Sequence, residues 1–242
     1  MKTVTRVVVL ALFVINCACG HRSRPNFELP RVMLWAWQRA ENLSFIDTQT
    51  TGVAYLAGTV RILPNGFPNF EPRFQPLQIQ PGTPLLAVVR IESAASNPRA
   101  QVAPLVQALN QVMHQPAIRG LQIDFDARAS ERAFYLSLLN ALRTHSPVPV
   151  GVTALASWCE GDRWLENTDI AEAVPMFFRM GKDETHNMHV TLSSCVSSIG
   201  LSTDEPWPVR RPPGVQRIYV FNPRAWNRDE YARTLRRIGD WK

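Results

Sequence analysis

Eight short apolar runs recur along the chain and constrain its fold more than any other feature. They are residues 32–37, 51–63, 85–92, 119–126, 148–158, 173–180, 196–202 and 217–222. Runs of this length fit strands that are buried on both faces, and most are followed by a helical or connecting segment. That alternation is typical of a parallel α/β fold. Because no Gly-x-Gly-x-x-Gly motif or obvious switch point favours an open sheet, we predict a compact, single-domain, TIM-like (β/α)8 barrel.

The segments between these runs predict that some helices of the barrel are short or missing. Residues 102–113 carry apolar side chains at three-and-four spacing, and Asn97-Pro98 is a suitable helix start before them. Ser130 is expected to cap the next helix, and the last helix is expected to begin near Asn227. We expect no full helix after the first, second and sixth strands.

Three connecting segments have weaker signals. Residues 40–46 are compatible with a short helical turn, and residues 161–171 with a short helix. Residues 64–84 contain six prolines, which interrupt every helical frame, so this stretch is predicted to be a loop or an extra hairpin.

The N-terminus resembles a secretory signal. Residues 1–20 contain two basic residues, an apolar run too short to span a membrane, and small residues with cysteines at the end. Cys19, which follows an alanine, resembles the lipidated cysteine of bacterial lipoproteins; a simply cleaved signal and a retained anchor are the alternatives. We therefore predict a tether over residues 21–30 and a barrel domain over 31–242. Export across the inner membrane and a lipid anchor in the cell envelope follow from the lipoprotein reading.

Charge and cysteine content exclude some functions. The chain has 26 basic and 20 acidic residues, and residues 1–20 hold two of the basic ones and no acid, which leaves a mild excess of +4. Without a run of Lys or Arg this excess disfavours nucleic-acid binding. Cys159 and Cys195 are expected to form a disulfide in an oxidising compartment, although their positions after and before strands argue for opposite ends of the barrel. No Cys-x-x-Cys or His-Glu-x-x-His spacing occurs, so neither a metal nor a cofactor is predicted.

The run at 119–126 ends in two carboxylates, Asp124 and Asp126. Because side chains alternate along a strand, Leu121, Ile123 and Phe125 should face the helices while the two acids face the barrel axis. Function in such barrels sits at the strand ends, where paired carboxylates supply acid–base chemistry and aromatic faces stack on sugars. The other candidates for substrate binding at strand ends are Trp35, Trp37, Tyr55, Arg90, Glu92, Trp158, Arg179, Asn222 and Trp226.

Four motifs together resemble an uncharacterised family of secreted bacterial barrel proteins. They are Gln122–Asp126, Ser157–Cys159, Val174–Gly181 and Gly200–Glu205. The Asp-x-Asp run also resembles the fourth strand of barrel glycoside hydrolases, so the resemblance implies carbohydrate as the partner. In chitinase-like barrels the catalytic glutamate stands two residues beyond the second aspartate, but this chain has Arg128 there. A chitinase mechanism is therefore not carried over.

We expect Asp126 to act as general acid or base, with Asp124 raising its pKa through a like charge. Asp204 or Glu205, after the seventh strand, is expected to supply the nucleophile or the base. The alternatives are a carbohydrate-binding or scaffold barrel without hydrolysis, buried ion pairs between the two aspartates and Arg90 or Arg179, and a metal-dependent hydrolase that uses Asp124, Asp126 and Glu92.

Overall fold

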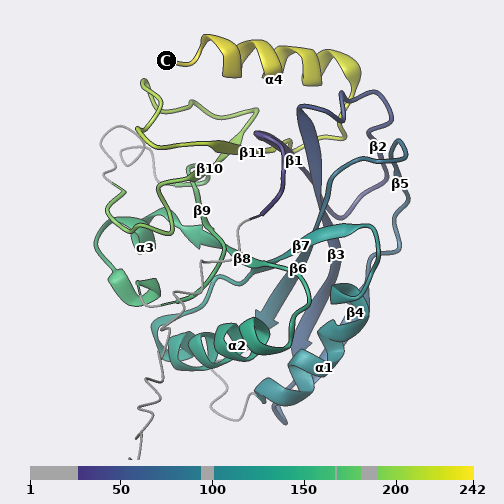
Figure 1. Ribbon diagram of the computed structural model, residues 1–242. Coiled ribbons are helices and arrows are strands. Elements are labelled where there is room, and N and C mark those ends of the chain that lie inside the picture. Colours follow the sequence, from purple (N-terminus) through teal and green to yellow (C-terminus); the bar gives the residue numbers. More distant parts are fainter. Residues whose placement is uncertain (1–26, 94–100, 167, 181–189) are drawn as a thin grey trace, which may run out of the picture.

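The computed structural model describes residues 27–93, 101–166, 168–180 and 190–242 (Figure 1). The strands are β1 (Val32–Ala36), β2 (Glu41–Asn42), β3 (Thr51–Ile62), β4 (Pro68–Pro72), β5 (Leu77–Gln78), β6 (Leu85–Ser93), β7 (Ile118–Asp124), β8 (Val150–Leu155), β9 (Ala173–Met176), β10 (Ser198–Ser202) and β11 (Arg217–Phe221). The helices are α1 (Val102–Met113), α2 (Arg132–His145), α3 (Ala156–Glu160) and α4 (Arg228–Asp240), with 3-10 turns η1 (Ala129–Glu131) and η2 (Arg163–Leu165).

Eight parallel strands close into a barrel, which confirms the predicted architecture in outline. The order around the barrel is β1, β3, β6, β7, β8, β9, β10 and β11, and β1 pairs with both β3 and β11. Each strand therefore lies beside its neighbours in sequence. β4 adds to the outer edge of β3 in the antiparallel direction.

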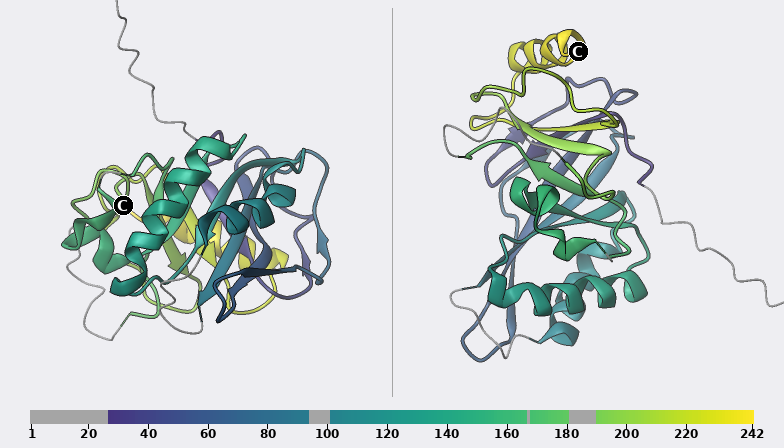
Figure 2. Two further views of the ribbon diagram at one scale, coloured as in Figure 1. Left: turned by 90° about the horizontal axis from the view of Figure 1, so that it is seen from below. Right: turned by 90° about the vertical axis from the view of Figure 1, so that its left-hand side faces the viewer.

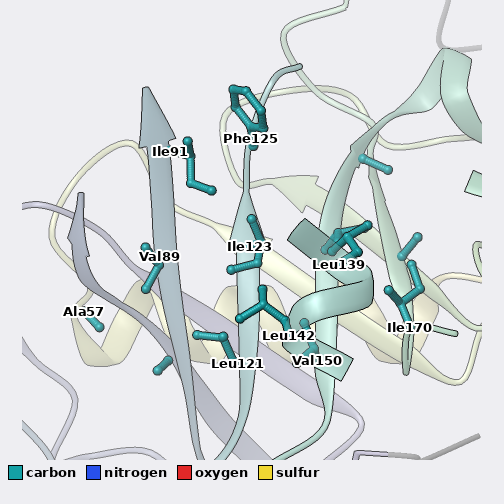
Figure 3. Packing of buried hydrophobic residues seen from close by; sticks show 14 of the residues in the cluster. Ala57, Val89, Ile91, Leu121, Ile123, Phe125, Leu139, Leu142, Val150 and Ile170 are labelled. Atoms are coloured by element: carbon teal, nitrogen blue, oxygen red, sulfur yellow. The ribbon is translucent and has the colours of Figure 1, made fainter. Parts of the chain in front are cut away.

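Helices cover only part of the barrel. α1 and α2 lie side by side against one side, and α4 covers the opposite side (Figures 1 and 2). Figure 3 shows Leu121 and Ile123 of β7 on the side of the sheet that carries Leu139 and Leu142 of α2. All four side chains are buried, so the apolar row of β7 packs on α2 as its alternation predicts. The predicted absence of helices after β1 and β3 is also observed.

A separate apolar cluster fills the barrel interior, and Phe27 closes the end of the barrel at which the parallel strands begin. Phe27 is only 7% exposed and lies so close to Gly120 of β7 that a Cβ there would come within 2.2 Å of the ring. Arg217 holds the same segment, since its guanidinium donates to the carbonyl oxygens of Phe27 at 3.2 Å and Pro30 at 3.2 Å. Residues 27–30, which we expected to belong to the tether, therefore pack beneath the barrel.

A buried carboxylate organises the same end of the barrel. Glu172, just before β9, accepts hydrogen bonds from Arg217 Nη1 and from Ser198 Oγ, each at 2.5 Å, and from the hydroxyl of Tyr219. Glu172 is 2% exposed, so the carboxylate of its ion pair with the partly buried Arg217 lies out of solvent. Because a buried charge must be compensated, these contacts fix the register of three strands around Glu172.

Several connecting segments differ from the sequence prediction. Residues 40–46 form β2 and a turn in place of a helical turn, because β2 pairs with β5. The proline-rich stretch 64–84 contains β4, so the hairpin alternative is confirmed. Ser130 lies inside η1 and does not cap α2. The side chain of Asn227 does cap α4 by accepting from the backbone N–H of Glu230 at 2.9 Å.

Cys159 and Cys195 form a disulfide, with Cα atoms 5.9 Å apart. The two cysteines would lie at opposite ends of the barrel if the fifth strand continued to residue 158, as predicted. In the structure β8 ends at Leu155, and α3 turns the chain so that Cys159 meets the segment before β10.

The N-terminal predictions fall outside the part of the chain that the structure describes. These are the signal at 1–20, lipidation of Cys19 and the tether up to residue 26, and the helix start at Asn97-Pro98 also lies outside it. Within the described ranges, no helix combines the length and apolar character that a bilayer crossing requires.

Candidate functional site

A cavity of about 480 Å³ opens at the carboxyl ends of the barrel strands. It is lined by Trp35, Trp37, Arg90, Asp124, Asp126, Thr153, Leu155, Ala156, Ser157, Met176, Phe178, Arg179, Met180 and Phe221. Its size falls within the range of ~300–1,000 Å³ that is usual for ligand sites. The barrel therefore places its main cavity where barrels of this kind carry their active sites.

Asp124, the last residue of β7, is the buried acid of this cavity. It is 7% exposed, and its Oδ1 accepts a hydrogen bond from Thr153 Oγ1 at 2.6 Å. Arg90 Nη1 lies 3.9 Å from its Oδ2. Burial raises the pKa of Asp124 to about 6 and the charge of Asp126 adds to that rise, while the Thr153 bond and Arg90 lower it. Because burial outweighs the arginine, Asp124 can hold a proton close to neutral pH.

Asp126 lies two residues further on and is exposed. Phe125 between the two acids is 4% exposed and packs edge-to-face on Phe134 and Tyr135 of α2, at centroid distances of 6.4 and 5.2 Å. This packing anchors the chain after β7, so that both acids reach the same cavity. The predicted alternation thus extends past the end of the strand.

A row of ion pairs with alternating charge starts at Asp124 and continues across the carboxyl-terminal ends of β6 and β3 to β4. Beyond Asp124, Arg90 pairs with Glu92 at 3.2 Å, Glu92 with Arg61 at 2.6 Å, and Arg61 with Glu71 at 3.0 Å. These residues come from β6, β3 and β4, whose other face carries buried apolar side chains. Arg90 is therefore shared between two acids, Asp124 and Glu92.

Aromatic side chains form the base and one part of the wall. Trp35 is 3% exposed and its Nε1 donates to Gln122 Oε1 at 3.0 Å. Its ring lies where a Cβ on Gly200 would come within 2.8 Å, so only glycine fits at that point of β10. Phe178 stacks on Phe221 with centroids 5.8 Å apart and planes at 7°. These rings offer flat apolar faces of the kind that bind sugar rings.

Arg179 lies at the rim in a left-handed backbone conformation, with φ of 55°. Its backbone N–H donates to Glu205 Oε2 at 2.8 Å, and its guanidinium lies over the Phe221 ring at 5.5 Å from the centroid. A non-glycine residue in this region is strained, and the Glu205 carboxylate is one of the contacts that hold it.

The two acids after the seventh strand do not line the cavity. Glu205 is turned toward the Arg179 backbone, and Asp204 Oδ1 accepts from Ser202 Oγ at 2.5 Å. The predicted partnership of Asp126 with Asp204 or Glu205 is therefore not formed. The donors come from Ser202, at the end of β10, and from the backbone of Arg179, after β9, which sequence spacing could not reveal.

Two predicted binding residues lie elsewhere, Tyr55 because it is inside its strand and Trp158 because β8 ends before it. Tyr55 is in the middle of β3, on the outer face, and its hydroxyl donates to Gln115 Oε1 at 2.7 Å. Trp158 lies in α3, is 3% exposed and packs on Trp164 with ring centroids 4.8 Å apart. Both side chains contact the apolar core on the outside of the barrel and do not reach the cavity.

Asn222 and Trp226 also have structural contacts. Asn222 is 1% exposed, and its Oδ1 accepts from Thr203 Oγ1 at 3.0 Å. Trp226 is 4% exposed and donates from Nε1 to the carbonyl oxygen of Trp35 at 3.1 Å. β11 ends at Phe221, so the inward position belongs to that residue and not to Asn222.

Of the predicted binding residues, five line the site: Trp35, Trp37, Arg90 and Arg179 in the main cavity, and Glu92 in a smaller one beside it. Sequence reasoning missed Thr153, Phe178 and Phe221. Thr153 and Phe221 share the strand parity of inward residues, which would have found them had the strand ends been known. Phe178 follows β9, where no parity applies.

The described ranges contain no group of three or more His, Cys, Asp or Glu side chains arranged to hold a metal ion. Comparisons of the chain with models of protein families, with curated proteins and with solved structures find no match. Its function must therefore be inferred from the chemistry of the cavity itself.

Proposed function

We propose that the protein binds a carbohydrate chain at the barrel mouth and hydrolyses a glycosidic bond there. One observation carries the proposal: a carboxyl group with a pKa of about 6, Asp124, opens into an aromatic-lined cavity beside a second, exposed carboxylate, Asp126. Glycoside hydrolysis needs one protonated and one ionised carboxyl group, and a buried carboxyl group beside an exposed one suits this pair of roles.

In this proposal Asp124 is the acid and Asp126 the base, whereas the sequence-based expectation gave Asp124 only the tuning of the pKa of Asp126. Asp124 gives its proton to the glycosidic oxygen as the bond to the anomeric carbon breaks. Asp126 takes a proton from the water that adds to that carbon. The sugar ring lies against Trp35, Trp37 and Phe221, whose faces exclude water from one side of it.

The pKa of Asp124 argues against a purely structural ion pair. A carboxylate held by a dominant arginine has a depressed pKa. Here the pKa is raised, because burial raises it more than Arg90 lowers it. Arg90 lies 3.9 Å away and its side chain is partly exposed, which weakens its effect.

The test is release of reducing ends from a panel of defined polysaccharides. We expect Asp124→Asn and Asp126→Asn each to reduce the rate at least 100-fold while binding persists. Asp240→Asn, on the exposed end of α4, is the matched control and should leave the rate unchanged. Release that is undiminished in both site variants would refute the assigned roles.

A second candidate function is carbohydrate binding without hydrolysis. The placement of Asp204 and Glu205 outside the main cavity favours it, as does Arg128 at the position of the chitinase-like acid. Calorimetric binding of oligosaccharides by the wild-type protein, with no reducing ends released and no effect of Asp126→Asn, would establish this alternative.

We also propose export across the inner membrane and lipidation of Cys19, with the barrel anchored in the cell envelope. The support is the pattern of residues 1–20. Labelling with radioactive palmitate should mark the wild-type protein but not a Cys19→Ser variant. A Cys19→Ser variant that still incorporates label would contradict the assignment.

A further inference from the structure

A second, smaller cavity of about 180 Å³ adjoins the main one. It lies between the end of β6 and the segment that follows β7, and the two cavities share Arg90, Asp124 and Asp126. The two aspartates therefore stand at the junction of two adjoining spaces, and do not lie at the closed end of one.

The two spaces differ in chemistry. The main cavity has aromatic walls, whereas the second has charged ones, with Glu92, Arg128 and Glu131 added to the shared residues. A ligand in the main cavity is held largely by ring faces, and a ligand in the second cavity must be held by hydrogen bonds.

Glu131 provides a polar atom suited to that purpose. Its Oε2 accepts from the backbone N–H of Arg128 at 2.8 Å, which fixes the side chain at the start of η1. Its Oε1 accepts no hydrogen bond from any residue within the described ranges. This oxygen is buried, since Glu131 is only 6% exposed. A buried carboxylate oxygen without a donor is costly, and a ligand hydroxyl at this cavity would remove that cost.

A sugar hydroxyl suits this position better than a cation. Arg90 lines the same space and already pairs with Glu92 at 3.2 Å and with Asp124 at 3.9 Å, so it competes with a metal ion for both carboxyl groups. The acidic side chains present, among the residues described, do not form a metal-binding group.

We propose that the second cavity is a subsite for one of the two sugar units joined by the bond that is broken, the other unit lying in the main cavity. Glu131 accepts a hydrogen bond from a hydroxyl group of the sugar in the second cavity. This inference rests on the proposed function. It implies that the smallest good ligand has two sugar units, one in each cavity, with the glycosidic oxygen between them at Asp124 and Asp126. Arg128 then serves the same subsite, at the position where chitinase-like barrels carry their catalytic acid.

The experiment measures binding in the Asp126→Asn background, so that ligands stay intact. Cello-, chito- and xylo-oligosaccharides of one to six units are titrated calorimetrically into this variant with and without Glu131→Gln. Glutamine can keep the bond to the Arg128 backbone while placing an amide donor where Oε1 was. We expect Kd to rise about tenfold for ligands of two or more units and to stay unchanged for single units.

Two further variants keep the result interpretable. Glu166→Gln is the matched control, since Glu166 pairs with Arg163 and lines neither cavity. Arg128→Gln, an exposed change in the second cavity, should raise Kd several-fold for the longer ligands if Glu131→Gln does not fold.

The outcomes separate the two proposals. Affinity that is independent of ligand length and indifferent to both Glu131→Gln and Arg128→Gln would overturn the subsite but leave the proposed function standing. A rise in Tm with 1 mM calcium chloride that Glu131→Gln removes would identify a cation site and also overturn it. Failure of the wild-type protein to bind or cleave any glycan would refute the proposed function, and the subsite with it.

Discussion

The hydroxyl of Thr153 donates a 2.6 Å hydrogen bond to Oδ1 of Asp124, and this bond opposes the effect of burial on the acid. Burial favours the neutral carboxyl group, whereas a donor to its oxygen favours the carboxylate. The pKa of about 6 is thus a balance between burial, which raises it, and neighbouring groups, among which the Thr153 hydroxyl lowers it most.

Replacing Thr153 by valine should move that balance. The variant keeps the side-chain shape and loses the donor, so the pKa of Asp124 should rise above about 6 by about one unit. Hydrolysis that needs the protonated acid should then persist to a pH about one unit higher. The pH–rate profile measures this, with Thr144→Val on the exposed face of α2 as control. A profile that shifts to lower pH would exclude Asp124 as the acid.

Asp124→Asn should stabilise the protein in alkaline solution. The carboxyl group has a pKa of about 6 when folded and 3.8 as its ordinary value, so the folded state binds the proton more tightly. Stability is therefore lost as pH rises from about 4 to 6, by about 3 kcal/mol in total. Asparagine does not incur this loss. Urea unfolding should show a more stable variant at pH 8 and no difference at pH 4; a variant that is less stable at pH 8 would contradict the pKa.

Gly120→Ala should destabilise the fold through Phe27. The added methyl group would lie 2.2 Å from the phenyl ring, and overpacking of this kind costs about 1–3 kcal/mol. In a Phe27→Ala background the same change should cost much less, because the ring that it meets is gone. Denaturant unfolding of both single variants and the double variant measures the coupling. Fully additive costs would show that Phe27 does not occupy the barrel end.

Among single substitutions that remove a charge, Glu172→Gln should lower the free energy of unfolding by one of the largest amounts. It leaves Arg217 partly buried without its carboxylate, which typically costs about 3–5 kcal/mol. Glu166→Gln, which breaks an exposed pair with Arg163, should cost less than about 1 kcal/mol. Free energies of unfolding in urea compare the two, and equal costs would contradict the structural role of Glu172.

The disulfide should contribute measurably to stability. Cys159 and Cys195 are separated by 36 positions in sequence, for which loop closure predicts about 4 kcal/mol. Double substitution by serine should lower the free energy of unfolding by about this amount, with the far-ultraviolet spectrum retained. Lowering by less than about 1 kcal/mol would indicate that the link does not restrain the unfolded chain.

The barrel was predictable because its strands carry their own signal. Aliphatic runs such as 85–92 are buried on both faces, so composition alone identifies them, and the alternation in β7 assigned Asp124 to the interior. The strand ends were not predictable. Apolar runs at 148–158 and 173–180 continue past β8 and β9 into α3 and a bend, and tertiary contacts decide where pairing stops.

The differences between the predicted and the observed lining of the cavity follow from those ends. A shift of one residue at the end of a strand changes which side chain faces the cavity, so the inward position falls on Phe221 and not on Asn222. Asp204 and Glu205 lie in a turn, where hydrogen bonds to Ser202 and to the Arg179 backbone set their directions. Such contacts have no periodic signature in the sequence.

The position of Phe27 has a consequence for how the barrel would be presented at a surface. Phe27 lies at the end of the barrel opposite the cavity, and seven residues separate it from Cys19. A chain of that length reaches at most about 25 Å. If Cys19 is lipidated as proposed, the closed end of the barrel therefore stays close to the bilayer and the mouth is directed outward. The protein would then take up chains from the space beyond its own membrane, and the lipid surface to which it is attached would stay out of its reach.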